Sequence, residues 1–127
     1  MERIISSNDG RIACIQRCQD YKWIVDVDGK RGNPYSHIAE DSFIFSPNGR
    51  SFAYAAGEDR NGKWFVVKNG KEGKHFDFIK SPPTLTFSPD GKRLAYVAEL
   101  NCKEIAVVDE VIGEPQIYTW GLTFSPD

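Results

Sequence analysis

Cysteine and histidine are scarce in this chain, which has three cysteines and two histidines in 127 residues. Cys14, Cys18 and Cys102 are an odd number with no Cys-x-x-Cys spacing, so we expect free thiols and no disulfide framework. His37 and His75 fall at different positions of the repeat described below, and no third ligand accompanies them. The sequence therefore predicts no zinc site, and we expect neither a metal nor a cofactor.

An excess of charge of one sign is also lacking. Lysine and arginine number 16 against 18 aspartates and glutamates, which gives a net charge of −2. That balance argues against nucleic acid or an anionic membrane as the main partner. No apolar run reaches the ~18 residues of a membrane span, and residues 1–7 do not resemble the start of a signal peptide. We predict a cytoplasmic protein, with the periplasm as the alternative if the chain is processed or truncated.

Familiar catalytic motifs are absent as well. There is no glycine-rich phosphate loop between a strand and a helix, no Gly-x-Ser-x-Gly and no His-Glu-x-x-His. No stretch carries a sustained apolar period near 3.6 residues, so we expect no helix of consequence.

What the chain has is an internal repeat. The phrase Phe-Ser-Pro-Asn-Gly that begins at Phe45 returns as Phe-Ser-Pro-Asp-Gly at Phe87 and as Phe-Ser-Pro-Asp at Phe124, and a degenerate copy contains Ile5. These four anchors lie 40, 42 and 37 residues apart, which is the period of a propeller blade of four short strands.

Between the anchors, each repeat reads as a row of antiparallel hairpins. Asp-Gly at 28–29 and Asn-Gly at 69–70 separate apolar runs, and both residue pairs tolerate the positive φ of a hairpin turn. In the third copy we place this turn at 110–113, and we expect one further strand each at 35–38 and 76–79. The predicted fold is all-β, a single domain of three four-stranded antiparallel blades over residues 1–40, 41–82 and 83–121, with a surplus strand at 122–127.

The repeats resemble those of the TolB-type, WD-repeat-like β-propeller family, whose signature is roughly Phe-Ser-Pro-Asp-Gly-Lys-x-Leu-Ala-Tyr. Residues 87–96 match it best, residues 45–54 match it partly, and the first copy departs most, with Asp9 at the glycine position and Cys14 at the tyrosine position. The resemblance implies a propeller fold and a habit of binding other molecules. It implies no reaction.

Four residues are weak candidates for ligand contacts. Trp23 and Trp64 align with each other and with Ile105, which favours a packing position between blades over a stacking platform. Asp26 aligns with valines in the other copies, and a carboxylate in an apolar strand is paired, exposed at a rim or functionally tuned. His37 lies on a predicted strand. We predict no catalytic residues.

Three repeats make half of a six-bladed ring, and known propellers close with about four to eight blades. We therefore expect a two-fold homodimer that completes the ring, or else a piece of a longer propeller. In the dimer, Leu122 and Phe124 would pair beside Ile12 and Ile15 of the other chain, displacing or flanking its N-terminal strand.

The expected function is that of a non-catalytic binding or scaffold module for a protein or small molecule. The alternatives are a propeller-type hydrolase or lyase with its site over the central channel, and a fragment of a longer propeller without activity of its own. The predicted inner strands offer serine and threonine but no histidine or carboxylate pair, which favours the binding module over the enzyme.

Overall fold

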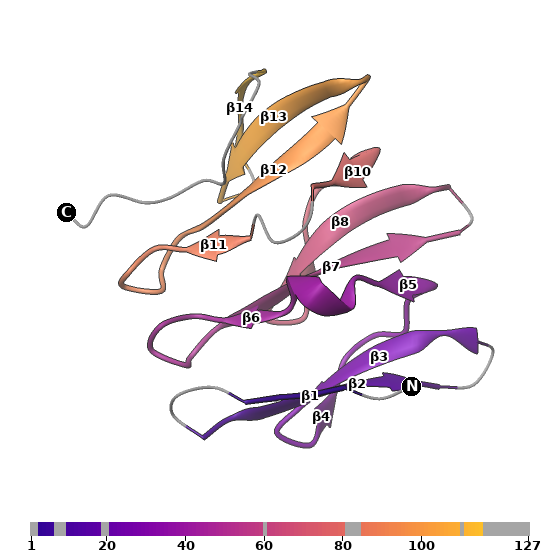
Figure 1. Ribbon diagram of the computed structural model, residues 1–127, viewed down its shortest axis with the longest axis vertical. Coiled ribbons are helices and arrows are strands. Elements are labelled where there is room, and N and C mark those ends of the chain that lie inside the picture. The colour runs from indigo at the N-terminus through magenta and orange to yellow at the C-terminus, as the bar shows by residue number, and fades with distance from the viewer. Residues whose placement is uncertain are drawn as a thin grey trace.

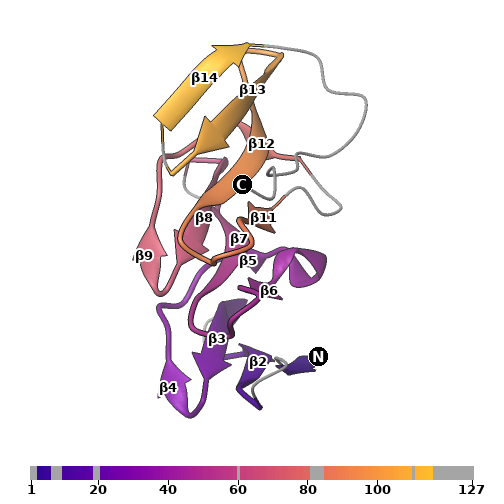
Figure 2. The same cartoon turned by 90° about the vertical axis from the view of Figure 1, so that its left-hand side faces the viewer.

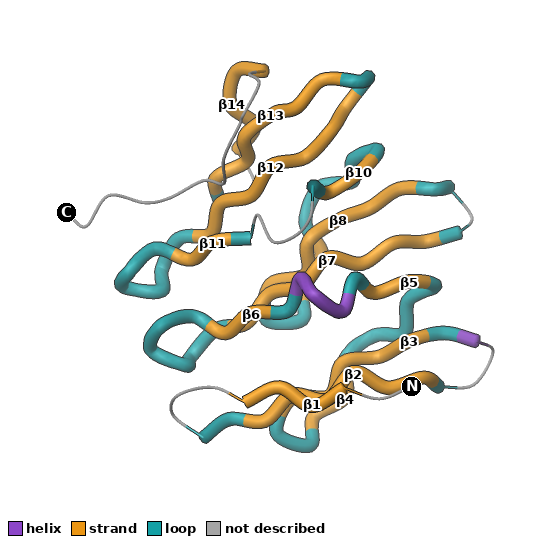
Figure 3. The backbone as a smooth tube through the Cα atoms, viewed as in Figure 1, coloured by secondary structure: helices purple, strands orange, loops and turns teal. Residues whose placement is uncertain are grey.

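Three antiparallel sheets are stacked along the long axis of the molecule (Figures 1 and 3). The computed structural model describes residues 3–6, 10–18, 21–59, 61–80, 85–109 and 111–115, and every structural statement below refers to these. Each sheet is one propeller blade, so the predicted all-β fold of propeller blades is confirmed. The helical content of the described residues is limited to 3-10 turns such as η2 (Glu40–Ser42).

The blades repeat one strand order. Blade 1 consists of β1 (Arg3–Ser6), β2 (Ile12–Arg17), β3 (Trp23–Val27) and β4 (Lys30–Arg31). Blade 2 consists of β5 (His37–Ile38) and β6 (Ile44–Phe45), which both pair with β7 (Phe52–Glu58), followed by β8 (Lys63–Lys68) and β9 (Lys71–Glu72). Blade 3 likewise pairs β10 (Phe78–Ile79) and β11 (Thr86–Phe87) with β12 (Leu94–Leu100), followed by β13 (Lys103–Val108) and β14 (Val111–Pro115).

The edge strands of the blades lie on two opposite sides of the stack. Figure 2 shows β4 and β9 on one side and β6 and β11 on the other. The turns after β6 and β11 and the turns after β3, β8 and β13 form one rim, which we call the turn rim. The hairpins that join β7 to β8 and β12 to β13 form the opposite rim, which we call the hairpin rim (Figure 1).

The chain passes from one blade to the next inside segments that the sequence indicated to be single strands. Tyr35 bridges Trp23 in blade 1, whereas His37, two residues later, pairs with Gly57 in blade 2. Phe76 and Phe78 divide between blades 2 and 3 in the same way. The expected strands at 35–38 and 76–79 were therefore wrong, because Ser36 and Asp77 are the points of crossover.

Those crossover residues fasten each blade to the next one at the hairpin rim. Ser36 Oγ donates to Glu58 Oε2 at 2.8 Å and accepts from the Asp59 amide at 3.1 Å. Asp77 does the equivalent in blade 3 by accepting from the Asn101 amide at 2.9 Å, and it also accepts from the Lys63 ammonium. Both side chains therefore cap the hairpin of the following blade.

The ladder registers correct the alignment of the repeats. Ile5 pairs with Ala13, as Ile44 does with Ala53, so Ser6 is the equivalent of Phe45. The glycine of the first copy is then Gly10, with φ of +84°, and not Asp9 as the sequence suggested.

In the third blade the register shifts the alignment by one residue as well. Glu104 pairs with Glu99 as Trp64 pairs with Gly57, so glutamate and not Ile105 occupies the tryptophan position. Val108 pairs directly with Val111, so β14 begins at Val111 and the expected turn at 110–113 is wrong.

The apolar core lies between the blades. Side chains alternate across each strand, so Ala53 and Ala55 of β7 pack toward blade 3 while Tyr54 and Ala56 pack toward blade 1. Tyr54 and Tyr96 are both fully buried, and burial raises the pKa of Tyr54 to about 12. Of the phenylalanine anchors that the structure describes, Phe87 is buried and Phe45 is partly exposed.

The Ser-Pro-Asx-Gly phrase folds into the same turn in blades 2 and 3. The buried Ser46 Oγ donates to Asn48 Oδ1 and accepts from the Ser51 amide, and Ser88 repeats both bonds with Asp90 and Arg93. Gly91 has φ of +75°, and a Cβ there would come within 3.0 Å of the Asn48 side chain of the preceding blade. The serines thus serve the backbone of the turn.

Replacing Phe87 with alanine removes a ring that is 8% exposed between blades 2 and 3. We expect Phe87→Ala to lower the free energy of unfolding by about 3–5 kcal/mol in urea titrations. Phe78, which is 41% exposed, is the control: its loss should cost about 1 kcal/mol through the edge-on contact with Trp64. Equal losses for the two variants would show that Phe87 is not a core residue.

Candidate binding site between the blades

Two of the four candidate contact residues lie together at the hairpin rim. The His37 ring stacks on Trp64 with centroids 6.0 Å apart, and its Nε2 lies 2.5 Å from Asp59 Oδ1. Trp64 also packs edge-on against Phe78 and lies so close to Gly57 that a Cβ there would approach the indole within 3.0 Å. The tryptophan is therefore a packing residue, and the His37–Asp59 pair lies exposed at the surface.

Trp23 and Asp26 do not join that cluster. Trp23 carries the Arg17 guanidinium 5.3 Å from its ring centroid. Asp26 pairs in register with Cys14, which in turn pairs with Ile4, so the three residues share the face of blade 1 that points away from blade 2. By register, Asp26 corresponds to the buried Val67 and to Val107.

The two described residues that were expected at the dimer interface differ in their exposure. Ile12 is 53% exposed, whereas Ile15 is completely buried between blades 1 and 2 and offers no side-chain surface to a partner. The expectation for Ile15 is therefore corrected. Leu122 and Phe124 lie outside the described residues.

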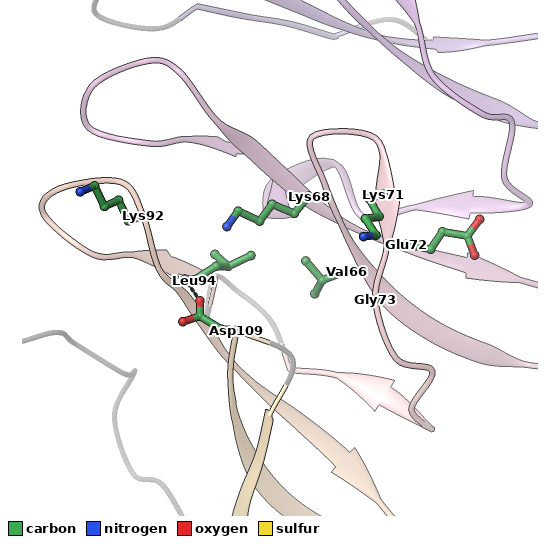
Figure 4. A pocket seen from close by; sticks show the side chains of 8 residues that line it. All are labelled: Val66, Lys68, Lys71, Glu72, Gly73, Lys92, Leu94 and Asp109. Atoms are coloured by element: carbon green, nitrogen blue, oxygen red, sulfur yellow. Dashed lines mark hydrogen bonds between the residues drawn. The ribbon is translucent and has the colours of Figure 1, made fainter.

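A cavity of about 300 Å³ lies between blades 2 and 3 at the turn rim (Figure 4). Val66 of β8 and Leu94 of β12 form its apolar floor, and Lys68 extends across it above Leu94 (Figure 4). The full lining is Val66, Lys68, Lys71, Glu72, Gly73, Lys92, Leu94 and Asp109.

The two acidic residues of this lining are occupied. Asp109 Oδ1 accepts from the Leu94 amide at 3.0 Å and Oδ2 from Arg93 Nε at 3.0 Å. Burial alone would raise the pKa of Asp109, but these two bonds and the nearby lysine charge of Lys68 hold it below its ordinary value. Glu72 accepts from the Tyr35 hydroxyl at 3.1 Å, and its carboxylate points away from the floor (Figure 4).

Lys68 is the residue that sequence reasoning missed. By register it is equivalent to Val27 and Val108, because the three pair with Ala53, Ala13 and Ala95 at the same position of the ladder. The signal was present in the sequence: each of these residues directly precedes the aspartate or asparagine of the turn, at Asp28, Asn69 and Asp109.

A second cavity of about 250 Å³ occupies the equivalent place between blades 1 and 2. Its floor is more apolar, with Val25, Val27, Phe52 and Tyr54, and Lys30 and Arg31 stand at its rim. Arg11 also lines this cavity, but its guanidinium is held by Asp28 and by the carbonyls of Gly49 and Arg50. The two cavities therefore share their position and differ in the charge at the floor.

The described residues contain neither a cluster of metal-ligating side chains nor a helix that could span a membrane. Three or more histidine, cysteine, aspartate or glutamate side chains do not gather there in a way that could hold a metal ion. None of the helices in that part of the chain has the length and apolar character needed to cross a membrane.

The structure is similar to the β-propeller domain of the Trilobed protease from Pyrococcus furiosus, a domain described as having an open velcro topology. The match has a TM-score of 0.54 at 13% sequence identity and covers 91% of this chain. The likeness shows the fold of this chain, which is that of β-propeller blades. It spans 42% of the length of the propeller it matches. No family model and no curated protein sequence matches the chain.

The hydrogen bonds that Asp109 accepts from the Leu94 amide and from Arg93 predict how stability depends on pH. Because the pKa of Asp109 is below its ordinary 3.8, its carboxylate stabilises the fold above that value, and this contribution is lost as pH falls through the lower folded pKa. Asp109→Asn keeps an acceptor for the Leu94 amide, as Asn69 does naturally for Phe52, and should cost at most about 1 kcal/mol at neutral pH because the Arg93 pair is exposed.

We expect urea midpoints of the parent and the Asn variant to converge as pH falls from ~6 to ~2. Asp109→Ala, which also leaves the Leu94 amide without its acceptor, should stay below both throughout. A difference in urea midpoint between the parent and the Asn variant that stays constant with pH would contradict the lowered pKa of Asp109.

Proposed function

We propose that this chain is a non-catalytic binding module that closes a six-bladed propeller ring with a second copy of itself. The observation that carries the proposal is the free face of blade 1, made of Ile4, Ile12, Cys14 and Asp26. Ile4 is 72% exposed and Ile12 is 53% exposed, although the equivalent positions of blades 2 and 3 pack against a preceding blade.

The equivalent face of blade 2 carries apolar side chains that pack against the preceding blade. Phe43, Phe52 and Tyr54 form a stacked aromatic layer, with centroids 5.8 to 6.4 Å apart, that packs toward blade 1. An exposed apolar face of this kind marks an interaction site. A further blade is the occupant it fits, since each described blade packs face to face with its neighbour, and the matched propeller is more than twice as long as this chain.

The repeat phrase also supports a relationship to the TolB-type propellers. The serine of Phe-Ser-Pro-Asx-Gly is buried in both complete copies and holds the turn together, so the phrase is retained for a physical reason. We infer from it that this chain and the TolB-type repeats share the same blade construction.

The geometry refines how the two copies would join. β1 already pairs with β2 along Arg3–Ser6, so a strand donated by a partner would add to the free edge of β1 and would not displace it. Of the two arrangements expected for residues 122–127, flanking the N-terminal strand is therefore the one we propose.

The mass in solution tests the ring. Light scattering should give twice the 14.3 kDa of one chain. Ile4→Lys should weaken the dimer because it places a charge in the apolar interface, and it should not unfold the monomer, in which Ile4 is exposed. Tyr21→Lys, at a residue 81% exposed on the hairpin rim, is the matched control and should leave the dimer intact.

Removing residues 121–127 should give monomer or aggregate, because the added strand would be lost. A well-folded dimer without these residues would exclude the strand exchange, and a full-length chain that stays monomeric at high concentration would exclude the ring.

We also propose that the module has no hydrolytic activity. The His37–Asp59 pair is exposed at 54% and 77% of its side chains. Ser36 Oγ donates to Glu58 and accepts from the Asp59 amide, and Glu58 is paired with Lys22, so these groups hold the hairpin together and do not form a serine–histidine pair. Turnover of a generic ester, peptide or glycoside that disappears in His37→Ala or Asp26→Ala would prove this part wrong.

A further inference from the structure

We propose that the cavity between blades 2 and 3 binds an acidic peptide segment, with a carboxylate of the peptide on Lys68 and an apolar side chain on Val66 and Leu94. This inference deepens the proposed binding function by naming the class of partner and the site. It concerns a surface at the turn rim, away from the free face of blade 1.

Lys68 is the first reason. It stands on a strand position that faces the next blade and that is valine in blades 1 and 3. Its side chain is half-buried and lines the cavity beside Val66 and Leu94. An ammonium there can attract a carboxylate, which valine could not do.

The surplus of lysines over acids in the lining is the second reason. Within the described residues, the side-chain amines of Lys68, Lys71 and Lys92 take part in none of the ion pairs. Three lysines line the cavity with two acids: Asp109, which feels the charge of Lys68 but is bonded to the Leu94 amide and to Arg93, and Glu72, which accepts from Tyr35. The cavity therefore presents an excess of positive charge in a chain whose net charge is −2.

The shape of the site favours a peptide over a small anion. The three lysines come from β8, from β9 and from the turn before β12, so their charges are spread around an apolar floor and do not converge on one point (Figure 4). A lone phosphate would contact one of them and leave the floor wet. An extended peptide with carboxylates on either side of an apolar residue would contact both the lysines and the apolar floor, in a cavity of about 300 Å³.

The cavity between blades 1 and 2 serves as an internal comparison. There the floor position is Val27, and the Arg11 guanidinium is held by Asp28 and by two carbonyls. We therefore assign the peptide to the cavity that contains Lys68, and Lys30→Gln at the rim of the other cavity should have little effect.

Fluorescence anisotropy of the full chain tests the site. The probe is a short labelled peptide of glutamate and aspartate around a central leucine, and its glutamine and asparagine counterpart is the neutral control. We expect the acidic peptide alone to bind, with an affinity that falls as salt rises. Lys68→Val should weaken binding about tenfold or more, the loss expected for one charge-assisted hydrogen bond.

Lys68→Val installs the residue that blades 1 and 3 already use, so it should fold, and Lys68→Gln is the second variant if its melting temperature falls. Lys103→Gln on the hairpin rim removes the same charge elsewhere and should bind as the parent does. Equal binding of the neutral peptide, equal affinity in Lys68→Val and Lys103→Gln, displacement by inorganic phosphate at the peptide's own concentration, or no binding at all would each overturn the inference.

The outcome of the peptide-binding experiment can be distinguished from the outcome of the test for the dimeric ring. A dimer that does not bind the peptide would refute this site and leave the assembly standing. A monomer that binds the peptide through Lys68 would support this site and refute the ring.

Discussion

The fold depends on a clasp that recurs once in each blade. Asp28, Asn69 and Asp109 adopt φ of 54°, 52° and 51°, and the amide of each donates to the carbonyl of the first residue of β2, β7 or β12. The side-chain Oδ1 of each accepts the amide of that same residue at 2.9 to 3.0 Å. A single aspartate or asparagine in each blade thus closes the turn and fixes the start of the neighbouring strand, since both residue types tolerate the left-handed conformation and carry a short acceptor.

Fixing that register decides what the blades present to each other. A slip of one residue would move every side chain of a strand to the opposite face, so that Tyr54 and Ala53 would exchange neighbours. Because the core lies between blades and not within one, a blade buries its apolar side chains against the blade next to it. Contacts along both rims reinforce this stacking: Arg11 binds the carbonyls of residues 49 and 50, Asn48 Nδ2 reaches the Asp90 carbonyl, and Lys22 pairs with Glu58.

The sequence predicted the features that depend on local chemistry. The spacing of the Phe-Ser-Pro-Asx-Gly phrase indicated blades, and the Asp-Gly and Asn-Gly pairs indicated turns; the structure has both. Register was harder because the connections differ in length. Four residues separate β7 from β8, whereas two separate β12 from β13. Alignment from the phenylalanine anchor therefore misplaced Ile105, while counting back from the clasp residue places Glu104, Trp64 and Trp23 together.

The candidate site was missed for that same reason. Aligned from the anchors, Asp26 was the polar residue that interrupted an apolar column, and Lys68 passed unnoticed beside the turn. Aligned from the clasp, two charges replace aliphatic residues in the strands: Asp26 where blades 2 and 3 have valine, and Lys68 where blades 1 and 3 have it.

The two charges lie in different surroundings. Both side chains are half-buried. Asp26 is on the face of blade 1 that no described blade covers. Lys68 lines a cavity between two packed blades, above an apolar floor and at a position where the repeat otherwise has valine. The physical difference between an open face and an enclosed one therefore directs attention to Lys68 for ligand binding, and leaves Asp26 as part of the surface that a further blade would cover.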